Sequence, residues 1–273
     1  MSILEEIFAN KRQELAQRQR TRPLEAVIAA AQAAPQSLDF VAALRPEYAS
    51  NVAALRPALI AEVKRGSPSR GLLVRDFDPL RLARLYRDNG AAAISVLTDE
   101  RYFGGQLTHL EGIAGMAPRP PLLRKDFIFD PYQVYEARAA GADAILLIVA
   151  GLTGEQLAEL HALAGSLGMA ALVEVHTRRE LERALALKPA LVGINNRDLR
   201  NFSVRLETTL ELLPHVPAGV VVVSESGIHS RRDVERLGAA GVRAVLVGEA
   251  LVAAQDTAAK VRELSGAVQA VSP

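Results

Sequence analysis

The stretch Gly141-Ala-Asp-Ala-Ile-Leu-Leu-Ile-Val149 decides the fold of this chain. It places a glycine and a polar residue directly before a short, continuously apolar run. A glycine that ends a helix, followed at once by a strand buried on both faces, is typical of a parallel sheet. Comparable phrases, Gly90-Ala-Ala92 and Gly241-Val-Arg243, precede two other apolar runs. The repeat therefore predicts helices that alternate with parallel strands.

Eight short apolar runs along the chain have this character. They begin about 20 to 35 residues apart, which is the span of a strand with its crossover helix. We expect the strands at residues 58–64, 92–98, 121–126, 144–149, 170–175, 191–195, 220–224 and 244–247. Eight such units predict an α/β fold, a (β/α)8 TIM barrel, although an open doubly wound sheet has the same pattern. We expect a single barrel domain over residues 1–273.

Helix boundaries between these runs agree with this interpretation. Two of them combine an N-cap aspartate with proline at the first helical position, Asp78-Pro79 and Asp130-Pro131. Two others have the spacing of a capping box, Thr153 with Gln156 and Thr177 with Glu180. Glycine stands where the helices should end, at Gly90, Gly141, Gly168 and Gly241.

Residues 1–50 stand outside this rhythm and predict an N-terminal helical extension. Apolar residues between Ile3 and Leu15 lie at helical spacing, residues 24–34 form a second helical stretch, and Ser37 can cap a third short helix. The apolar stripe needs a surface to cover. We expect it to pack across the barrel, with a lid over the active site or a dimer contact as alternatives.

The composition argues against several classes of function. A net charge of +1 gives no broad cationic field, so we expect neither nucleic-acid nor membrane binding. The longest apolar run is too short to span a bilayer, and the first residues carry acids rather than a signal-like apolar run. A chain without cysteine fits a reducing compartment, so we expect a cytoplasmic protein, a monomer or weak homodimer. The histidines show no ligand spacing; we predict no metal and assign them no role.

Lysine is scarce in this chain, with five residues against 27 arginines (32 minus 5). Two of the five, Lys64 and Lys125, stand at the C-terminal ends of expected strands. A lysine can lose its proton and an arginine effectively cannot, so these positions suggest proton transfer or imine formation. We expect an apolar mouth with neighbouring cations to lower the pKa of such a lysine.

The ends of the predicted strands carry an acid–base set. In a (β/α)8 barrel these ends converge on one face, where the active site lies. Glu62 and Lys64 point the same way, because side chains alternate along a strand. Ionisable or amide side chains end four other strands. The predicted set is Glu62, Lys64, Lys125, Glu174, Asn195 and Glu225.

The loops after the seventh and eighth strands predict a phosphate site. Barrels of this type bind phosphate there through backbone N–H groups, and Ser226, Gly227 and Gly248 hold these positions. Arg197 and Ser67 can add side-chain contacts, because guanidinium and hydroxyl groups suit phosphate oxygens. The expected ligand is therefore a small phosphorylated molecule.

Six motifs, in order, resemble the indole-3-glycerol phosphate synthase family. The similarity covers residues 50–255, and the helical extension also resembles that family. The motifs are Ile60-Ala-Glu-Val-Lys-Arg-Gly-Ser-Pro-Ser-Arg-Gly71, Ser95-Val-Leu-Thr-Asp-Glu-Arg-Tyr-Phe-Gly-Gly105, Leu123-Arg-Lys-Asp-Phe127, Leu172-Val-Glu-Val-His176, Gly193-Ile-Asn-Asn-Arg-Asp-Leu199 and Ser224-Glu-Ser-Gly-Ile228.

The resemblance implies conversion of 1-(2-carboxyphenylamino)-1-deoxyribulose 5-phosphate to indole-3-glycerol phosphate, CO2 and water, without a cofactor. By similarity, Lys125 would be the acid for ring closure. Glu174 and Lys64 would handle the dehydration, with Glu62 positioning Lys64, and the donor of the final proton stays open between Lys64 and Glu174.

The resemblance also implies binding residues. Asn195 would hold the substrate hydroxyls, and Glu225 would support the same network. The aromatic ring would be sandwiched by Phe103, Phe127 and Leu199. The phosphate would be held by Ser67, Arg197, Ser226, Gly227 and Gly248.

Two positions depart from the family pattern. Arg70 stands where many members have lysine, and it still provides a cation. Glu249 stands where serine is frequent, and its charge would repel a phosphate unless the side chain points away.

Three alternatives stay open at this point. A Schiff-base aldolase on the same barrel would use Lys125 as its imine former. A phosphoribosyl-sugar isomerase would share the barrel but would not explain the aromatic loop around Tyr102 and Phe103. A non-catalytic phosphate-binding barrel would keep the pocket, although it has no need for two proton donors.

Overall fold

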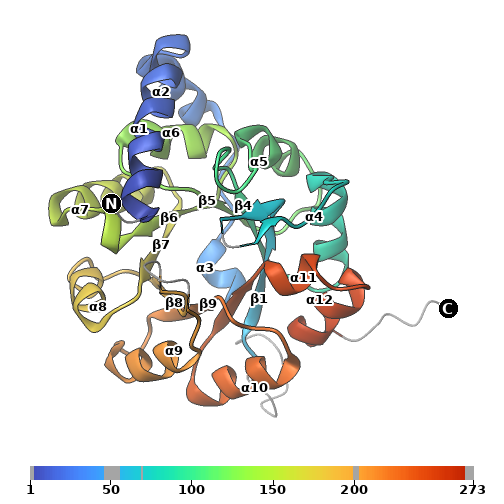
Figure 1. Cartoon of the computed structure of the whole chain (residues 1–273). Coiled ribbons are helices and arrows are strands. Elements are labelled where there is room, and N and C mark those ends of the chain that lie inside the picture. The colour runs from blue at the N-terminus through green and yellow to red at the C-terminus, as the bar shows by residue number, and fades with distance from the viewer. Residues whose placement is uncertain (1–2, 46–55, 69, 199–202, 268–273) are drawn as a thin grey trace.

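The computed structural model describes residues 3–45, 56–68, 70–198 and 203–267, and Figure 1 shows its course. Eight parallel strands close into a barrel in the order β1-β10-β9-β8-β7-β6-β5-β4. Because β1 pairs with both β10 and β4, the barrel has no open edge. The predicted (β/α)8 barrel is confirmed and the open sheet is excluded. The strands are β1 (Ala58–Val63), β4 (Ala93–Leu97), β5 (Leu122–Lys125), β6 (Ala144–Ile148), β7 (Ala170–Val175), β8 (Leu191–Asn195), β9 (Val221–Glu225) and β10 (Ala244–Val247).

Each strand lies within one residue of its predicted bounds. The long loop after β1 adds a small antiparallel pair, β2 (Gly66–Ser67) with β3 (Gly71–Leu72). The helices form an outer ring around the barrel (Figure 1), and their apolar faces join the outward strand residues in one buried cluster. They are α4 (Pro79–Asp88), α5 (Leu107–Ala114), α6 (Pro131–Ala139), the 3-10 turn η2 (Val149–Gly151), α7 (Gly154–Ser166), α8 (Arg178–Leu185), α9 (Glu207–Leu212), η3 (Leu213–His215), α10 (Arg231–Ala240), α11 (Glu249–Val252) and α12 (Thr257–Ser265).

Most predicted helix caps are confirmed. One of the two predicted capping boxes forms only one of its two expected hydrogen bonds. Asp78, Asp130 and Thr153 cap α4, α6 and α7 through their side chains. At α8 the Thr177 hydroxyl accepts the Glu180 N–H at 3.2 Å as predicted. The Glu180 carboxylate does not return to the Thr177 N–H, because it accepts the His176 N–H at 2.7 Å instead.

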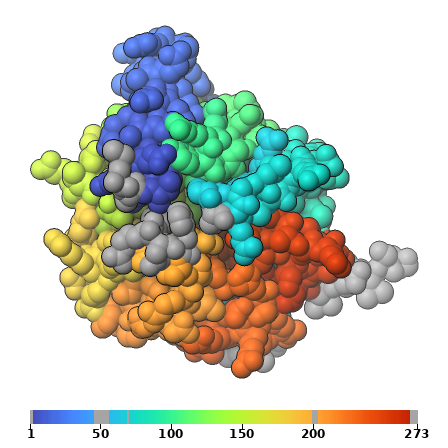
Figure 2. All heavy atoms as spheres, in the orientation of Figure 1, coloured from blue at the N-terminus to red at the C-terminus, as the bar shows by residue number. Residues whose placement is uncertain are grey.

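The N-terminal extension forms three helices, α1 (Ile3–Thr21), α2 (Leu24–Ala33) and α3 (Phe40–Ala43). The cap of α3 is Asp39 rather than Ser37; the Ser37 hydroxyl donates to the Gly168 carbonyl at 2.5 Å. Phe40 joins the inward-facing residues at the start of the strands, so α3 closes that end of the barrel. Figure 2 shows the N-terminal segment in blue, running from near the middle of this face to a projection at the top of the molecule.

Helix α1 lies at the opposite end, beside the loops that follow the strands. The Phe8 ring packs edge-on against Phe127 and Phe129, at centroid distances of 5.8 and 5.9 Å. The Lys11 side chain is 1% exposed and forms ion pairs with Asp99 and Asp126. Helix α1 therefore packs across the barrel next to its mouth. Among the described residues, no helix has the length and apolar character needed to cross a membrane.

Candidate active site

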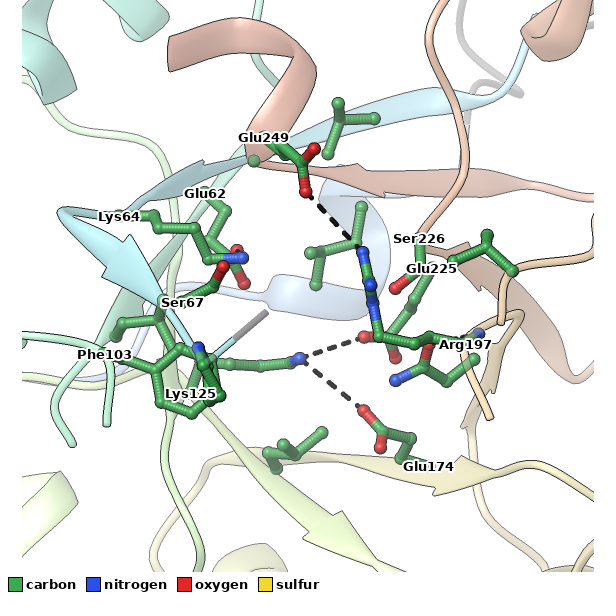
Figure 3. A pocket seen from close by; sticks show the side chains of 18 of the residues that line it. Glu62, Lys64, Ser67, Phe103, Lys125, Glu174, Arg197, Glu225, Ser226 and Glu249 are labelled. Atoms are coloured by element: carbon green, nitrogen blue, oxygen red, sulfur yellow. Dashed lines mark hydrogen bonds and ion pairs between the residues drawn. The ribbon is translucent and has the colours of Figure 1, made fainter. Parts of the chain in front are cut away.

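A cavity of about 550 Å³ opens at the carboxyl ends of the strands. Both lysines singled out by the sequence line this cavity (Figure 3). The other predicted acid–base residues line it too: Glu62, Glu174, Asn195 and Glu225. Residues that are up to 163 positions apart (225 minus 62) thus share one cleft, because parallel strands end on one face.

Each lysine in the cavity has a carboxylate partner. The Lys64 Nζ lies 2.7 Å from Oε2 of Glu62, which precedes it by two residues on β1. The Lys125 Nζ lies 3.1 Å from Glu225 Oε2 and 3.5 Å from Glu174 Oε2 (Figure 3). These three carboxylate side chains are at most 4% exposed. The cavity floor therefore holds alternating positive and negative groups in a largely dry environment.

The charges of this cluster correct the prediction of a lowered lysine pKa. Burial acts to lower the pKa of Lys125, but the negative charges of Glu225, Glu174 and Glu62 outweigh it and raise that pKa well above the usual value. Burial would raise the pKa of Glu62, yet Lys64 and Lys125 together hold it below its usual value. The cluster therefore keeps Lys125 as an ammonium and Glu62 as a carboxylate.

Glu225 is a carboxylate of this cluster whose pKa is raised towards neutrality. Burial raises the pKa of Glu225 to about 7, with the nearby Glu174 adding to the effect against the attraction of Lys125. One glycine makes room for it, because a Cβ on Gly193 would lie 2.3 Å from Glu225 Oε1. Gly193 was not predicted as a site residue, and its position inside a buried strand was the available signal.

The residues predicted to hold a phosphate also line the cavity, namely Ser67, Arg197, Ser226, Gly227 and Gly248. The Asn195 side-chain oxygen accepts the Arg197 N–H at 3.0 Å and so fixes the start of that loop. Ser226 and Gly227 adopt positive φ angles of 67° and 76°. Gly248 is required by close packing, because a Cβ there would lie 2.4 Å from Glu62 Oε2.

Glu249 lies beside this group and is paired with two arginines. Its Oε1 is 3.0 Å from Nη2 of Arg70, and its Oε2 is 3.6 Å from Nη2 of Arg197 (Figure 3). The carboxylate therefore does not point away from the cavity, and the two guanidinium groups compensate its charge. Arg70, on the loop after β1, is thereby joined to Arg197 on the loop after β8.

The aromatic side of the cavity contains Phe103 and Phe127, with ring centroids 6.1 Å apart. The Lys64 Nζ lies 5.9 Å from the Phe103 ring centre, so an ammonium sits over an aromatic face. Leu199, the third predicted ring contact, lies outside the described residues. Three apolar lining residues come from α1 and were missed as site residues: Ile3, Leu4 and Ile7. Their helical spacing was the only signal in the sequence.

A histidine also approaches the acid–base cluster. The His176 Nε2 lies 3.5 Å from Glu174 Oε1, on the side of Glu174 away from Lys125. No role was assigned to this residue from the sequence, because it has neither a metal-ligand spacing nor a nearby histidine.

Fold and cavity together define a (β/α)8-barrel enzyme with buried lysine and carboxylate groups beside a candidate anion site. A family model described as indole-3-glycerol phosphate synthase matches residues 4–264. The chain belongs to this family, and so to the carboxy-lyases of tryptophan biosynthesis that act on a small phosphorylated substrate.

Individual relatives support the same assignment. The chain is 53% identical to the indole-3-glycerol phosphate synthase of Roseiflexus castenholzii, over 97% of this chain and 98% of that protein. It is 58% identical to the indole-3-glycerol phosphate synthase of Dehalococcoides mccartyi, over 76% of this chain and 80% of that protein.

Solved structures of distant proteins share the fold. A 3-hexulose-6-phosphate synthase from Salmonella typhimurium superposes with a TM-score of 0.60 at 15% identity, over 77% of this chain and 97% of that one. A chain of the tryptophan synthase complex from Pyrococcus furiosus gives 0.57 at 18% identity, over 77% and 98%. At these identities the likeness concerns the fold alone.

Proposed function

We propose that the Lys/Glu cluster of this cavity closes the indole ring of 1-(2-carboxyphenylamino)-1-deoxyribulose 5-phosphate, releasing CO2 and water. The observation that carries the proposal is Lys125, held as an ammonium between Glu174 and Glu225 in the cavity that it shares with Lys64. Ring closure puts negative charge on the substrate's ketone oxygen, and a charged, positioned ammonium is the donor that this step needs.

Lys125 would donate its proton to the ketone oxygen as the aromatic carbon attacks. The bond to the carboxylate carbon then breaks, and its electrons restore the aromatic ring. The hydroxyl left behind must depart as water. Lys64 and Glu174 are the two candidates for its proton donor, and Glu62, 2.7 Å from the Lys64 Nζ, would position Lys64. Asn195 and Glu225 would complete the polar floor.

The two remaining walls would orient the substrate. Phe103 and Phe127 would hold the aromatic ring, together with Leu199. The phosphate would bind at the far side of the cavity, where Arg197 provides a guanidinium and the loops provide N–H groups. The contributing residues would be Ser67, Arg197, Ser226, Gly227 and Gly248. No cofactor and no metal is needed for these steps, and we place the protein in the cytoplasm as a monomer or weak homodimer.

The direct test is to add the carboxyphenylamino-deoxyribulose phosphate to the purified protein and follow indole fluorescence. The background is low because the chain contains no tryptophan. Lys125→Ala should lower kcat by about 10² or more while substrate binding is nearly retained. Equal binding without turnover in either protein would instead indicate a binding barrel.

A Schiff-base mechanism makes a different prediction for the same residue. An imine former must react as a neutral amine, and the carboxylates around Lys125 favour its ammonium. Treatment with borohydride in the presence of substrate should therefore leave the chain unmodified. Covalent trapping at Lys125 would count against the proposed synthase chemistry.

A further inference from the structure

The proposed reaction takes up one proton from solvent in each turnover. The ketone oxygen gains two protons before it leaves as water, and the carbon next to the ring nitrogen loses one when the indole double bond forms. The carboxylate departs as CO2 and carries no proton away. The donors around the reacting atoms must therefore be recharged from outside, although Glu174 is 3% exposed and Lys125 is 14% exposed.

A line of titratable groups leads from the surface to these donors. The Glu180 Oε2 lies 3.3 Å from the His176 Nδ1, and the His176 Nε2 lies 3.5 Å from Glu174 Oε1. The other oxygen of Glu174 lies 3.5 Å from the Lys125 Nζ. Exposure rises outward along this line, from 3% at Glu174 through 11% at His176 to 19% at Glu180.

The local fold fixes the positions of His176 and Glu180 relative to Glu174. Glu174 and His176 are two residues apart at the end of β7, so their side chains leave the strand on the same side. Thr177 caps α8 and places Glu180 in its first turn. The Glu180 carboxylate accepts the His176 N–H at 2.7 Å, which holds it beside the ring. This contact is the one that replaces the predicted capping box.

We propose that His176, held in place by Glu180, relays protons from solvent to Glu174, and through it recharges Lys125. This inference rests on the proposed ring-closing function. The imidazolium, with its Nδ1–H facing the Glu180 carboxylate, releases its Nε2 proton to Glu174 and is left as a neutral ring. Glu174 then passes its proton to the Lys125 amine left after ketone protonation. Solvent then protonates the neutral ring again, which accounts for the one proton taken up in each turnover.

Two observations support a relay over a passive contact. The His176 Nε2 is buried and forms no hydrogen bond among the described residues, and Glu174 Oε1 lies 3.5 Å away, so a small rotation of the ring would bring its proton to that carboxylate. Burial acts to lower the pKa of His176, but Glu180 on α8, Glu174 on β7 and Glu225 on β9 outweigh it and raise that pKa above the usual value. The surrounding carboxylates therefore favour the protonated ring, which is the form that has a proton to give at Nε2.

The test compares His176→Gln with His161→Gln in the full chain. Glutamine preserves a hydrogen-bonding side chain at position 176 but has no titratable proton. The control residue His161 lies on α7, outside the residues that line the cavity. We expect kcat of His176→Gln to fall by about tenfold or more with little change in KM. Imidazole-type buffers should restore the rate in proportion to their concentration, with a dependence on their pKa. His161→Gln should behave as wild type.

A structural role would give a different result. An unchanged kcat at every pH, or a loss that no buffer acid of the imidazolium type restores, would overturn the relay. Glu180→Gln provides a second variant. It leaves His176 in place but removes the carboxylate beside its Nδ1, and it should also lower kcat in a buffer-dependent way.

Failure of the underlying function is recognised separately. Wild-type protein that forms no indole product rejects the function itself. The ring is tested without substrate by NMR titration: Glu174→Gln and Glu180→Gln should each lower the pKa of His176, and an unchanged titration would reject the proposed line of groups.

Discussion

Replacing Lys11 by methionine should destabilise the fold far more than replacing another paired lysine. The Lys11 Nζ lies 2.8 Å from Asp99 Oδ2 and 3.1 Å from Asp126 Oδ1, and both aspartates are fully buried. Methionine keeps most of the packing but removes the charge. Breaking a buried pair by removing one partner costs about 3 to 5 kcal/mol, since a carboxylate is left buried without compensation.

The structure places the expected cost near the lower limit of that range. Asp126 keeps an ion pair with Arg124 at 3.1 Å and a hydrogen bond from Thr98 at 2.6 Å. Among the described residues, the Asp99 side chain keeps the hydrogen bond from the Tyr102 N–H at 2.8 Å, so it is the less compensated of the two. We expect about 3 kcal/mol. For a chain of this size, that corresponds to a fall in Tm of about 6 to 12 °C.

The assay is thermal and urea unfolding of matched variants. Lys260→Met is the control, because Lys260 lies 2.7 Å from Glu263 but is 24% exposed, and such surface pairs contribute about 0 to 1 kcal/mol. Adding Asp99→Asn to Lys11→Met should recover part of the loss, since it removes the uncompensated charge. Equal effects of Lys11→Met and Lys260→Met, or no recovery in the double variant, would refute this reasoning.

Two further predictions concern the carboxylates of the mouth. Glu249→Ser should lower the KM for the phosphorylated substrate several-fold and tighten competitive inhibition by inorganic phosphate. The reason is that it frees Arg70 and Arg197 from a competing negative charge. An unchanged or higher KM in steady-state kinetics would count against this. Burial raises the pKa of Glu225 to about 7, so the folded chain binds this proton more readily than the unfolded chain. The stabilising contribution of the bound proton is therefore present below pH ~4.5 and is lost as the pH rises towards 7. Glu225→Gln should therefore raise Tm relative to wild type more at pH 8 than at pH 5, and a parallel pH dependence of both proteins would contradict it.

The barrel could be predicted from the sequence because its signals are local. A continuously apolar strand and the glycine before it, as at Gly141 and residues 144–149, need no knowledge of distant residues. The capping box at Thr177 failed for the opposite reason. Its spacing is correct, but the Glu180 carboxylate finds another donor in the His176 N–H, and a spacing rule does not compare donors.

The membership of the site could be predicted, but its electrostatics could not. Lys64 and Lys125 share a cavity because the ends of parallel strands always meet on one face. The pKa of Lys125 depends on which groups face it across the barrel, and Glu225 lies 100 residues away in the chain (225 minus 125). Along the sequence, Lys125 stands between Arg124 and Asp126, so its neighbours in the chain do not indicate the sign of the shift, and the apolar mouth with neighbouring cations that we expected gave the wrong direction.

The positions of the few lysines indicate nearby buried carboxylates rather than proton transfer as such. Lys11, Lys64 and Lys125 each lie against buried carboxylates, yet only the last two line the cavity. An ammonium is a compact point charge that can be approached from several sides, whereas a guanidinium is a planar fork that favours paired contacts. The Lys11 Nζ contacts Glu14, Asp99 and Asp126 within 3.1 Å, and this arrangement suits an ammonium better than a guanidinium. In this chain, Lys11, Lys64 and Lys125 therefore mark buried carboxylates, whereas Lys260 forms a surface pair, and proton transfer follows only where such a buried group opens to a ligand.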